Sequence, residues 1–414
     1  MQRCVLFVGG GLETLPGLEL AKAMGLAVAV SDGNPAAPGL ALADHPLVAS
    51  TYDPAATVTA ARALAGRRPI DGVLCLAVDV PHTVAAVAEA LGLPGIGAQA
   101  ARLAMDKLAM KARLAARGLP VPFFAPVPDV PALLAIVARR GRDLVLKPVD
   151  SRGARGVQRL ARLDDLGAAF AEALRHSPTG RVMVEQFLGG PQLSTESLVV
   201  EGVAVTPGFS DRNYEYLDRF APFIIENGGE LPTRLPPDTV AAVADLVDRA
   251  ARALGIGRGV VKGDIVIHQG EPFVIELAAR LSGGYFCSHE IPRSTGVDLL
   301  GAAIRQCLGE AVPAAELAPR LARGVAQRWL FADPGVVTAV EGLAAARAVP
   351  GVFHLELRAG PGDVVAPINC HPARLGVVMA EADTREGAVA AAEAAVATIA
   401  VKTRPLGPAG APHG

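Results

Sequence analysis

The sequence predicts a protein of mixed α/β and α+β class, with a doubly wound parallel sheet, a small inserted α/β unit and an α+β unit at the C-terminus. Three observations predict this organisation. Short apolar runs alternate with helical stretches in the first hundred residues, two apolar runs flank Gln269-Gly270-Glu271 as in a β-hairpin, and short strands precede a capped helix near the end. A chain of 414 residues is also too long for one core, so two or three domains are expected.

Composition indicates an ordinary globular protein. The chain is 51% hydrophobic and 19% charged, with a formal net charge of −2, so there is no electrostatic reason to expect nucleic acid or an anionic membrane as a partner. The 5 cysteines are scattered without a C-x-x-C pair, as in a reduced protein. The N-terminal apolar run is too short for a signal peptide, and no run approaches the ~20 residues that span a bilayer. A cytoplasmic location is therefore expected.

Residues 1–100 alternate strands with helices, which is typical of a parallel sheet that binds ligands at its carboxyl edge. The expected strands are Cys4–Val8, Ala27–Ser31, Leu47–Ala49 and Gly72–Ala77, and the expected helices are Leu15–Met24, Ala55–Ala65 and Thr83–Leu91. The run Gly9–Gly11 resembles a dinucleotide fingerprint with Asp32 as a ribose ligand, but Thr14 occupies the position of the third glycine. A tight turn between strand and helix is the preferred interpretation.

Residues 101–200 contain a helix and a small inserted α/β unit. The helix is expected over Ala101–Arg117 and carries Lys107 and Lys111 on one face, which would ordinarily be solvated. The unit is expected to contain helices Pro131–Arg140 and Leu163–Leu174 and strands Asp143–Pro148, Val157–Leu160, Arg181–Phe187 and Leu193–Val200. Lys147 on an apolar strand precedes the glycine-bearing loop Asp150–Gly156, a combination that suits an anion. A mobile surface turn is the alternative, and no Gly-Lys-Ser/Thr of a Walker A motif occurs.

Residues 203–232 are interpreted as a long irregular loop, rich in aromatic and charged side chains that include Arg212 and Glu226. Such a loop inside a compact domain is often functional, so it is expected to line a substrate pocket; the alternative is a surface loop pinned by its aromatic residues. A helix over Pro236–Leu254 follows. The last unit is expected to contain strands Val325–Phe331, Val352–Arg358, Asp363–Val365 and Arg374–Ala380, helices Val337–Arg347 and Thr384–Ala400, and a disordered tail Arg404–Gly414.

The most informative stretch is the hairpin within Val260–Gly284. Pairing centred on Gly270 places Asp264 opposite Glu276. It also places Val266 opposite Val274 and His268 opposite Pro272, with Lys262, Asp264, Glu276 and Arg280 on one face and Val261, Ile265, Ile267, Phe273, Ile275 and Leu277 in the core. Carboxylates directly opposite one another repel unless a cation lies between them, and Mg²⁺ prefers such oxygen ligands. The alternative is a solvated face whose acids are neutralised by Lys262 and Arg280.

The order of these parts resembles the ATP-grasp superfamily, in its carboxylate–amine ligase type, with L-amino acid ligases, biotin carboxylase and carbamoyl-phosphate synthetase as relatives. The resemblance is carried by LKPVDSRGARGV, VEQFLGGPQLSTES and GDIVI…VIELAARLSGG, with further similarity at Ser294–Leu300 and Arg374–Ala395. It implies an ATP-grasp fold with a pre-ATP-grasp domain at 1–100, an ATP-grasp domain at 101–310 with a lid at about 123–190, a C-terminal domain at 311–403 and a tail at 404–414.

The resemblance also assigns roles to residues. The implied ATP ligands are Lys107, Lys147, Ser151, Gly153, Gly156, Glu185, Gln186, Leu188 and Gln192; the implied Mg²⁺ or Mn²⁺ ligands are Asp264 and Glu276; the implied catalytic residues are Arg280 and Lys262; and Ser282, Gly283 and Gly284 join Arg212 and Glu226 as substrate residues. Two positions depart from the family pattern. Ala278 stands where an asparagine is common, and Gly190-Pro191-Gln192 replaces the usual GxE.

The expected function is ATP-dependent ligation of a small carboxylate to a small amine. The carboxylate attacks the γ-phosphate of ATP, and the amine then displaces phosphate from the acyl phosphate. The resemblance further implies a homodimer. Alternatives are a biotin-carboxylase-like or purine-biosynthesis ligase, a nucleotide-binding protein with weak catalysis, which Ala278 favours, and a nicotinamide-dependent oxidoreductase, which the missing third glycine disfavours.

Overall fold

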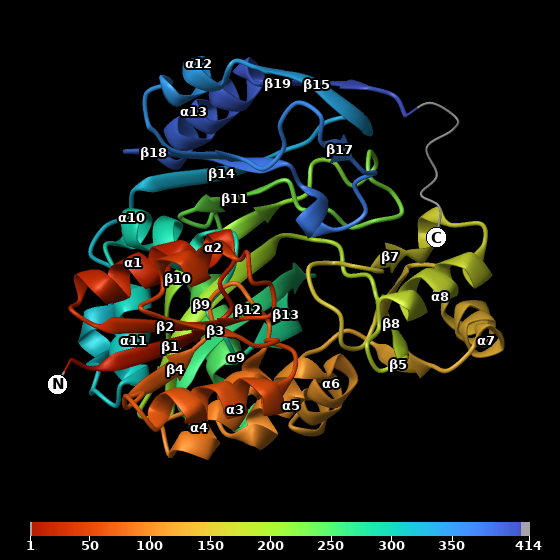
Figure 1. Ribbon diagram of the computed structural model, residues 1–414. Helices are drawn as coiled ribbons and strands as arrows, with labels where there is room; N and C mark the ends of the chain where they lie inside the picture. Colours follow the sequence, from red (N-terminus) through yellow and green to blue (C-terminus); the bar gives the residue numbers. More distant parts are fainter. Residues whose placement is uncertain (1, 407–414) are drawn as a thin grey trace. The chain divides into compact units, whose positions relative to one another are not determined.

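The computed structural model describes residues 2–406 and is shown in Figure 1. Its chain divides into two compact units built from segments that are distant in the sequence. The first unit comprises Met1–Val121, Gly190–Phe209 and Leu235–Leu321, and the second comprises Pro122–Gly189, Ser210–Arg234 and Ala322–Gly414. The division into four successive segments, read from the sequence, stays a prediction. Of the expected tail, Arg404 ends a strand, and residues 407–414 lie outside the described part of the chain.

The first unit begins with the expected parallel sheet. Its strands are β1 (Cys4–Val8), β2 (Ala27–Asp32), β3 (His45–Val48) and β4 (Gly72–Leu74), in the order β3-β2-β1-β4. The helical elements between them are η1 (Leu12–Thr14), α1 (Leu15–Ala23), α2 (Pro38–Leu42), α3 (Pro54–Ala65) and α4 (Pro81–Leu91). Helices α1 and α2 cover one face and α3 and α4 the other (Figure 1), so the sheet is doubly wound. Strand β4 is shorter than expected because Leu76 leaves it to bridge Leu281.

The single helix expected over Ala101–Arg117 is wrong, because the structure has two helices there. Helix α5 (Ala98–Met105) ends before Asp106, and α6 (Lys107–Ala116) begins after it. Asp106 has an extended backbone, and its carboxylate accepts a hydrogen bond from the amide of Ala109, which is the geometry of an N-cap. The restart turns Lys107 and Lys111 inward, so that they are 7% and 1% exposed. They do not form a solvated face.

An antiparallel sheet forms the centre of the first unit. Strands β13 (Glu271–Ala278), β12 (Gly259–His268), β9 (Gln192–Val200) and the first part of β10 (Val203–Asn213) follow one another in that order. Helix α9 (Pro237–Leu254) packs Val243, Leu246 and Val247 into a core shared with these strands. The unit is completed by η3 (Phe286–Glu290), α10 (Ile291–Thr295), α11 (Leu299–Cys307) and η4 (Ala314–Leu317).

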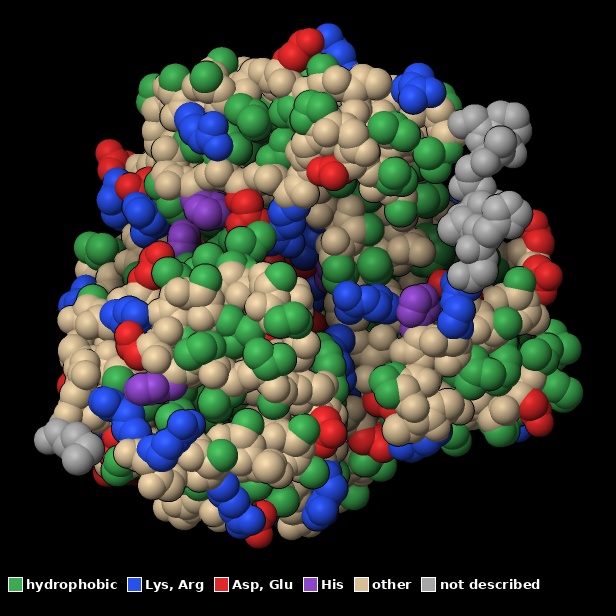
Figure 2. Space-filling model, viewed as in Figure 1, with side chains coloured by type: hydrophobic (Ala, Val, Ile, Leu, Met, Phe, Trp, Pro, Cys, Tyr) green, Lys and Arg blue, Asp and Glu red, His purple; other side chains and the backbone are tan. Residues whose placement is uncertain are grey.

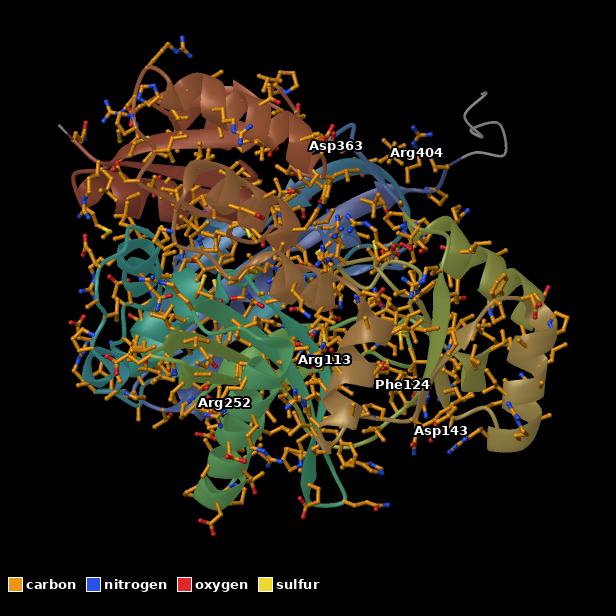
Figure 3. All side chains as sticks on the ribbon, turned by 90° about the horizontal axis from the view of Figure 1, so that it is seen from below. Arg113, Phe124, Asp143, Arg252, Asp363 and Arg404 are labelled. Atoms are coloured by element: carbon orange, nitrogen blue, oxygen red, sulfur yellow. The ribbon has the colours of Figure 1, made fainter. Side chains whose placement is uncertain are left out.

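The second unit contains a small α/β element at the place where the sequence predicts the lid. Its strands are β5 (Phe124–Val127), β8 (Val182–Gln186), β6 (Leu144–Pro148) and β7 (Gln158–Arg159), in that order. Helices α7 (Val130–Arg140) and α8 (Leu166–Arg175) and the turn η2 (Leu160–Arg162) share one core with these strands. Strand β5 was not predicted. Figure 3 labels its first residue, Phe124, together with Asp143, which precedes β6.

The rest of the second unit is an α+β arrangement. The end of β10 pairs with β11 (Gly228–Leu231), and the sheet continues with β14 (Gly324–Leu330), β18 (Gly376–Ala382) and β16 (Val352–Leu357). A second sheet has the order β17 (Val364–Val365), β15 (Gly335–Glu341), β19 (Ala400–Arg404). Helix α12 (Leu343–Arg347), the turn η5 (His371–Ala373) and helix α13 (Arg385–Thr398), which is N-capped by Thr384, complete the unit.

Two sequence predictions fail in strands β10, β11 and β15. The stretch 203–232 is not one irregular loop, because β10 and β11 take up both of its ends. The expected helix over Val337–Arg347 is a strand as far as Glu341, followed by one short helix. Strands β10 and β15 carry β-branched side chains, whereas β11 has none and is held by its pairing with β10 and β14.

Buried arginines hold β11 within the second unit. The Arg328 guanidinium donates to Glu230 at 2.6 Å, and Arg385 donates to Glu230 and, at 2.5 Å, to Asp211. Burial alone raises the pKa of the Glu230 carboxyl, but hydrogen bonds from the two guanidinium groups outweigh burial and lower it. This network could not be predicted from the sequence, because its members are far apart along the chain.

The surface carries both signs of charge. Acidic and basic side chains are interspersed over the face drawn in Figure 2, which agrees with the formal net charge of −2. Within residues 2–406, every helix is too short or too polar to cross a bilayer.

Candidate active site

Strands β12 and β13 form the predicted hairpin, and Asp264 lies opposite Glu276. The rest of the predicted register is off by one residue: Val266 pairs with Phe273, not Val274, and His268 pairs with Glu271, not Pro272. The turn contains two residues, Gln269 and Gly270, both with positive φ as a type I′ turn requires. A β-bulge between Asp264 and Ile265 then restores the predicted register at the carboxylates.

The bulge also corrects the predicted core face. Val274 is fully buried, whereas Phe273 and Ile275 are only partly buried. The carbonyl of Ile275, the extra residue of the bulge on β13, accepts a hydrogen bond from the Lys111 ammonium at 2.9 Å. The bulge therefore ties the hairpin to helix α6, which also carries Lys107.

A lysine accompanies each of the two carboxylates. Lys107 Nζ lies 3.1 Å from Glu276 Oε1, and Lys262 forms a close ion pair with Asp264 on its own strand. The side chains of Asp264 and Glu276 remain 22% and 24% exposed, so solvent and ligands reach them. Four side chains that the sequence predicts to act together thus meet on one face of the first unit.

The donors in this cluster fit a magnesium ion that also binds phosphate. Within residues 2–406, no group of three or more His, Cys, Asp or Glu side chains is arranged to hold a metal. Two opposed carboxylates match the one or two that Mg²⁺ takes from a protein when water and substrate phosphates fill its other positions. A structural metal with a full set of protein ligands is not what this cluster would hold.

The segment from Arg280 to Gly284 is anchored at each of several positions. The Arg280 guanidinium lies 3.5 Å from Asp79, and the amide of Gly284 donates to Glu13 at 2.7 Å. The amide of Ser282 donates to Glu196 at 2.6 Å, and the Ser282 hydroxyl donates to the other oxygen of Glu196. Burial opposes the charge of Arg280, but nearby acids outweigh burial and raise its pKa. The segment is held rigidly beside the carboxylate pair.

Glu196 is a buried acid of this region with a raised pKa, and sequence reasoning missed it. It is 0% exposed on β9, directly across from Lys262. Burial raises the pKa of the Glu196 carboxyl to about 7, although the hydrogen bonds from Ser282 and the charges of Arg280 and Lys262 oppose the shift. Its position in the run Gln192–Val200 was the only available signal, since an acid within a buried strand requires a partner.

The glycine turn after β1 agrees with the preferred interpretation, a tight turn between strand and helix. The Asp32 carboxylate accepts hydrogen bonds from the amides of Gly10 and Asn34, both at 2.8 Å, so it fixes its own loop. Gly9 has a φ of +109°, and a Cβ at this position would overlap Val78. Glycine is therefore required by the turn itself.

In the second unit, Lys147 and Glu185 form a buried ion pair between β6 and β8. Both side chains are 5% exposed, and they lie on the same face because Lys147 pairs with Met183 and Val145 pairs with Glu185. The implied phosphate ligand and the implied adenine ligand are thus in contact here. The amide of Gln186 already donates to the Phe123 carbonyl at 2.8 Å, whereas Leu188 follows the strand and is buried.

The loop Ser151–Gly156, which the family resemblance implies is a lid loop over the phosphates, contains two glycines in the left-handed region. Gly153 and Gly156 have φ angles of +64° and +71°. The amide of His371 donates to the Gly153 carbonyl at 2.9 Å, and Pro372 lies against Gly153. The loop is therefore attached to the C-terminal part of its own unit, a contact that the sequence did not predict.

Arg212 and Glu226, the two implied substrate residues of the second unit, form an ion pair with each other. The amide of Glu226 donates to His371 at 3.5 Å, and its carbonyl accepts from Arg374 at 3.4 Å. Beside them, Phe220, Ile225 and Ile368 form a small buried cluster. Phe220 and Ile225 thus anchor the loop between β10 and β11, and the roles of Arg212 and Glu226 as substrate residues stay a prediction. Gln192, implied as an ATP ligand, lies instead on β9 of the first unit, opposite Val266.

Three family models match successive parts of the chain. The ATP-grasp N-terminal domain matches residues 18–95, the ATP-grasp domain matches residues 104–284, and L-amino acid ligase C-terminal domain 2 matches residues 328–404. The crystal structure of L-amino acid ligase from Bacillus licheniformis has the same fold, with a TM-score of 0.82 and 22% identity over 97% of this chain and 99% of that one.

Two sequence relatives extend the comparison. The uncharacterized protein y4rH of Sinorhizobium fredii is 30% identical over 339 residues, which cover 80% of this chain and 68% of that protein. The D-alanine–D-alanine ligase of Desulforudis audaxviator is 34% identical over 197 residues, which cover 46% of this chain and 63% of that enzyme. The chain thus spans less than two thirds of the length of that ligase.

The fold and the carboxylate hairpin define a class, that of ATP-dependent ligases which join a carboxylate to an amine. The chain belongs to the ATP-grasp superfamily. Both the predicted fold class and the resemblance drawn from the order of the motifs are confirmed.

Proposed function

We propose that this protein ligates a small carboxylate to a small amine, with ATP as the phosphoryl donor, and forms an amide or peptide bond. The observation that carries the proposal is the opposition of Asp264 and Glu276 across the hairpin. Lys107 lies beside Glu276, and the anchored Arg280 follows two residues after the end of β13. Amino acids are the favoured substrates, because the C-terminal residues 328–404 match an L-amino acid ligase domain.

The residues of the first unit would bind the phosphates and the metal. Asp264 and Glu276 would hold Mg²⁺ or Mn²⁺, which neutralises charge on the transferring phosphoryl group when bound. Lys107 and Lys262 would exchange their present carboxylate partners for phosphate oxygens. Arg280 would stabilise the charge of the γ-phosphoryl group and of the acyl phosphate.

The second unit carries further predicted nucleotide ligands. Lys147 would contact phosphate and Glu185 would accept from the adenine amino group, which requires that their present ion pair opens. Ser151, Gly153 and Gly156 would supply backbone and hydroxyl donors from the lid loop. Attachment of Gly153 to His371 would set the resting position of that loop.

The reaction would proceed in two displacements. A carboxylate oxygen attacks the γ-phosphorus, the bond to the bridging oxygen breaks, and ADP leaves. The amine nitrogen then attacks the acyl carbon. The bond from this carbon to the phosphate oxygen breaks, phosphate leaves with the electron pair, and the nitrogen loses a proton. Ser282, Gly283 and Gly284 would lie against the substrate carboxylate, and the Ser282 and Gly284 donors would have to leave Glu196 and Glu13 to bind it. Positioning and charge neutralisation account for catalysis of this type.

The proposal extends to location and assembly. The free cysteines described in the chain fit a reducing cytoplasm. We propose a homodimer as well, and light scattering after size exclusion would measure it.

Release of ADP in the presence of paired acids and amines tests the function. Glu276→Gln should abolish turnover without loss of folding, because it removes one of two metal carboxylates. Glu271→Gln is the matched control, since Glu271 is exposed at the turn of the same strand. The proposal fails if folded Glu276→Gln releases ADP at the wild-type rate, or if no acid–amine pair stimulates ADP release by the wild type.

A further inference from the structure

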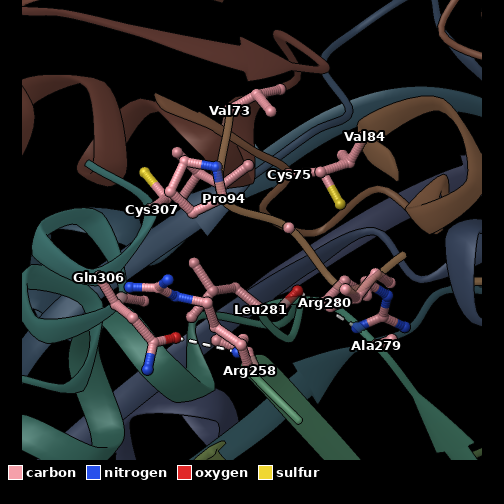
Figure 4. A pocket seen from close by; sticks show the side chains of 16 residues that line it. Val73, Cys75, Val84, Pro94, Arg258, Ala279, Arg280, Leu281, Gln306 and Cys307 are labelled. Carbon is pink, nitrogen blue, oxygen red and sulfur yellow. Dashed lines mark hydrogen bonds between the residues drawn. The ribbon is translucent and has the colours of Figure 1, made fainter. Parts of the chain in front are cut away.

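A cavity of about 70 Å³ lies in the first unit, away from the carboxylate pair. It is lined by β4, by α4 and the loop after it, by the start of β12, by the segment that follows β13, and by α11 (Figure 4). Neither Asp264 nor Glu276 is among its lining residues. The cavity is therefore separate from the proposed metal site, although Arg280 takes part in both.

The wall of the cavity is mostly apolar. Val73, Val84, Pro94, Ile96 and Ala303 supply hydrocarbon surface. A water molecule occupies about 10–15 Å³ by this kind of measure, so the space suits roughly five to seven non-hydrogen atoms. Burial raises the pKa of the Cys75 thiol and that of the Cys307 thiol to about 12, so both sulfurs stay neutral. A small hydrocarbon group fits this wall better than a polar one.

One positive charge faces the cavity without a carboxylate partner. Of the two arginines in the lining, Arg280 lies beside Asp79, whereas Arg258 has no acidic partner within residues 2–406. Figure 4 shows these arginines at opposite sides of the cavity. The amide of Gln306 is occupied at both ends, because it accepts from Gly259 at 2.9 Å and donates to Val199 at 2.8 Å. The guanidinium of Arg258 is thus the polar group left for a ligand.

We propose that this cavity binds a small monocarboxylate with a branched hydrocarbon body, whose carboxylate pairs with Arg258. The planar guanidinium matches a carboxylate in two parallel hydrogen bonds. A phosphate would bring more negative charge than one guanidinium neutralises, and it would place that charge against an apolar wall. The site is additional to the substrate site of the proposed ligase, and its existence does not depend on that function.

Binding of 3-methylbutanoate, measured by calorimetry without nucleotide, tests the assignment. A ligand of this size should bind with a dissociation constant on the order of 1 mM. Arg258→Gln should weaken binding at least tenfold, because one charge-assisted pair is lost. Ala303→Leu, which fills the cavity, should abolish binding. Uncharged 3-methylbutanamide and acetate, which lacks the hydrocarbon body, should each bind at least tenfold more weakly than 3-methylbutanoate.

The control variant is Arg252→Gln. Arg252 projects from α9 (Figure 3), is 52% exposed and pairs with Asp248, so its loss should leave binding unchanged. Arg258 is only partly buried, so Arg258→Gln should keep the melting temperature of the wild type and remain informative even if Ala303→Leu fails to fold. Equal affinity of Arg258→Gln and the wild type would place the ligand elsewhere, for example in the carboxylate substrate site, and would overturn the proposal. Absence of binding by the wild type at tens of millimolar would overturn it too.

Discussion

Glu196→Gln should change how the stability of the protein depends on pH. Glu196 is fully buried, and its folded-state pKa is raised to about 7, whereas an exposed glutamate titrates at about 4.5. Between these two values the folded protein holds a proton that the unfolded chain has released. The contribution of Glu196 to the free energy of unfolding is therefore present below the unfolded pKa and is lost as the pH rises through 7.

The size of this change in the free energy of unfolding follows from the shift in the pKa of Glu196. One pH unit corresponds to about 1.4 kcal/mol, so the wild type should lose about 3 kcal/mol between pH 4.5 and pH 8 relative to Glu196→Gln. Glutamine keeps an oxygen that accepts from the Ser282 amide but has no proton to lose. Other titrating groups are common to both proteins and cancel in the comparison.

The assay is the difference in melting temperature between the two proteins, recorded across this pH range. A change of about 2–4 °C for each kcal/mol is expected for a unit of this size, so the difference should drift by several degrees. The difference should be constant above pH 8, where Glu196 is ionised in both states. A difference in melting temperature that does not vary between pH 4.5 and pH 8 would refute the raised pKa of the buried Glu196 carboxyl. A difference that drifts in the opposite direction would refute it too.

Two further predictions concern the anchored arginine and the buried network. Arg280→Ala should lower kcat by orders of magnitude with little change in ATP affinity, measured by ADP release and by nucleotide titration; equal activity would remove Arg280 from the mechanism. Arg385→Ala should destabilise the second unit by about 3–5 kcal/mol, because it leaves the buried Glu230 with one of its two arginines and the partly buried Asp211 without the guanidinium that it pairs with. Arg404→Ala, on a strand near the end of the chain, is the exposed control, and a similar loss of melting temperature in both variants would contradict the prediction.

The sequence predicted well wherever a local pattern determines the structure. Alternating apolar runs located the strands of the parallel sheet, and the reversal at Gly270 brought Asp264 opposite Glu276. That second success depended on two departures that cancel, since a shorter turn and a bulge each shift the register by one residue. Without coordinates neither departure was visible, and the residues between them were placed wrongly.

The failures have a common physical cause. Strands β10, β11 and β15 are stabilised by partners that are remote in the sequence, so their local composition carried little signal. The break between helices α5 and α6 depends on the capping side chain of Asp106, and an aspartate can also occur inside a helix. Glu196 acquires its importance from Ser282, which lies 86 positions away. Long-range pairing of this kind cannot be read from spacing along one chain.

The pairing of lysines with the hairpin carboxylates favours the proposed metal site over a solvated strand face. A solvated strand face would leave Asp264 and Glu276 to water and to flexible surface cations. The structure instead brings Lys107, which is 7% exposed, from a separate helix to Glu276.

Burying an ammonium is costly unless it is paired, so surface acids alone give no reason to bury Lys107. Arg280, the other cation that could have neutralised the face, pairs with Asp79 and also lies within the electrostatic reach of Glu276. Two partly exposed carboxylates with Lys107, Lys262 and Arg280 nearby favour a ligand that brings both a metal ion and several negative oxygens. A metal–nucleotide complex has that composition, and a free metal ion does not, because the lysines would repel it.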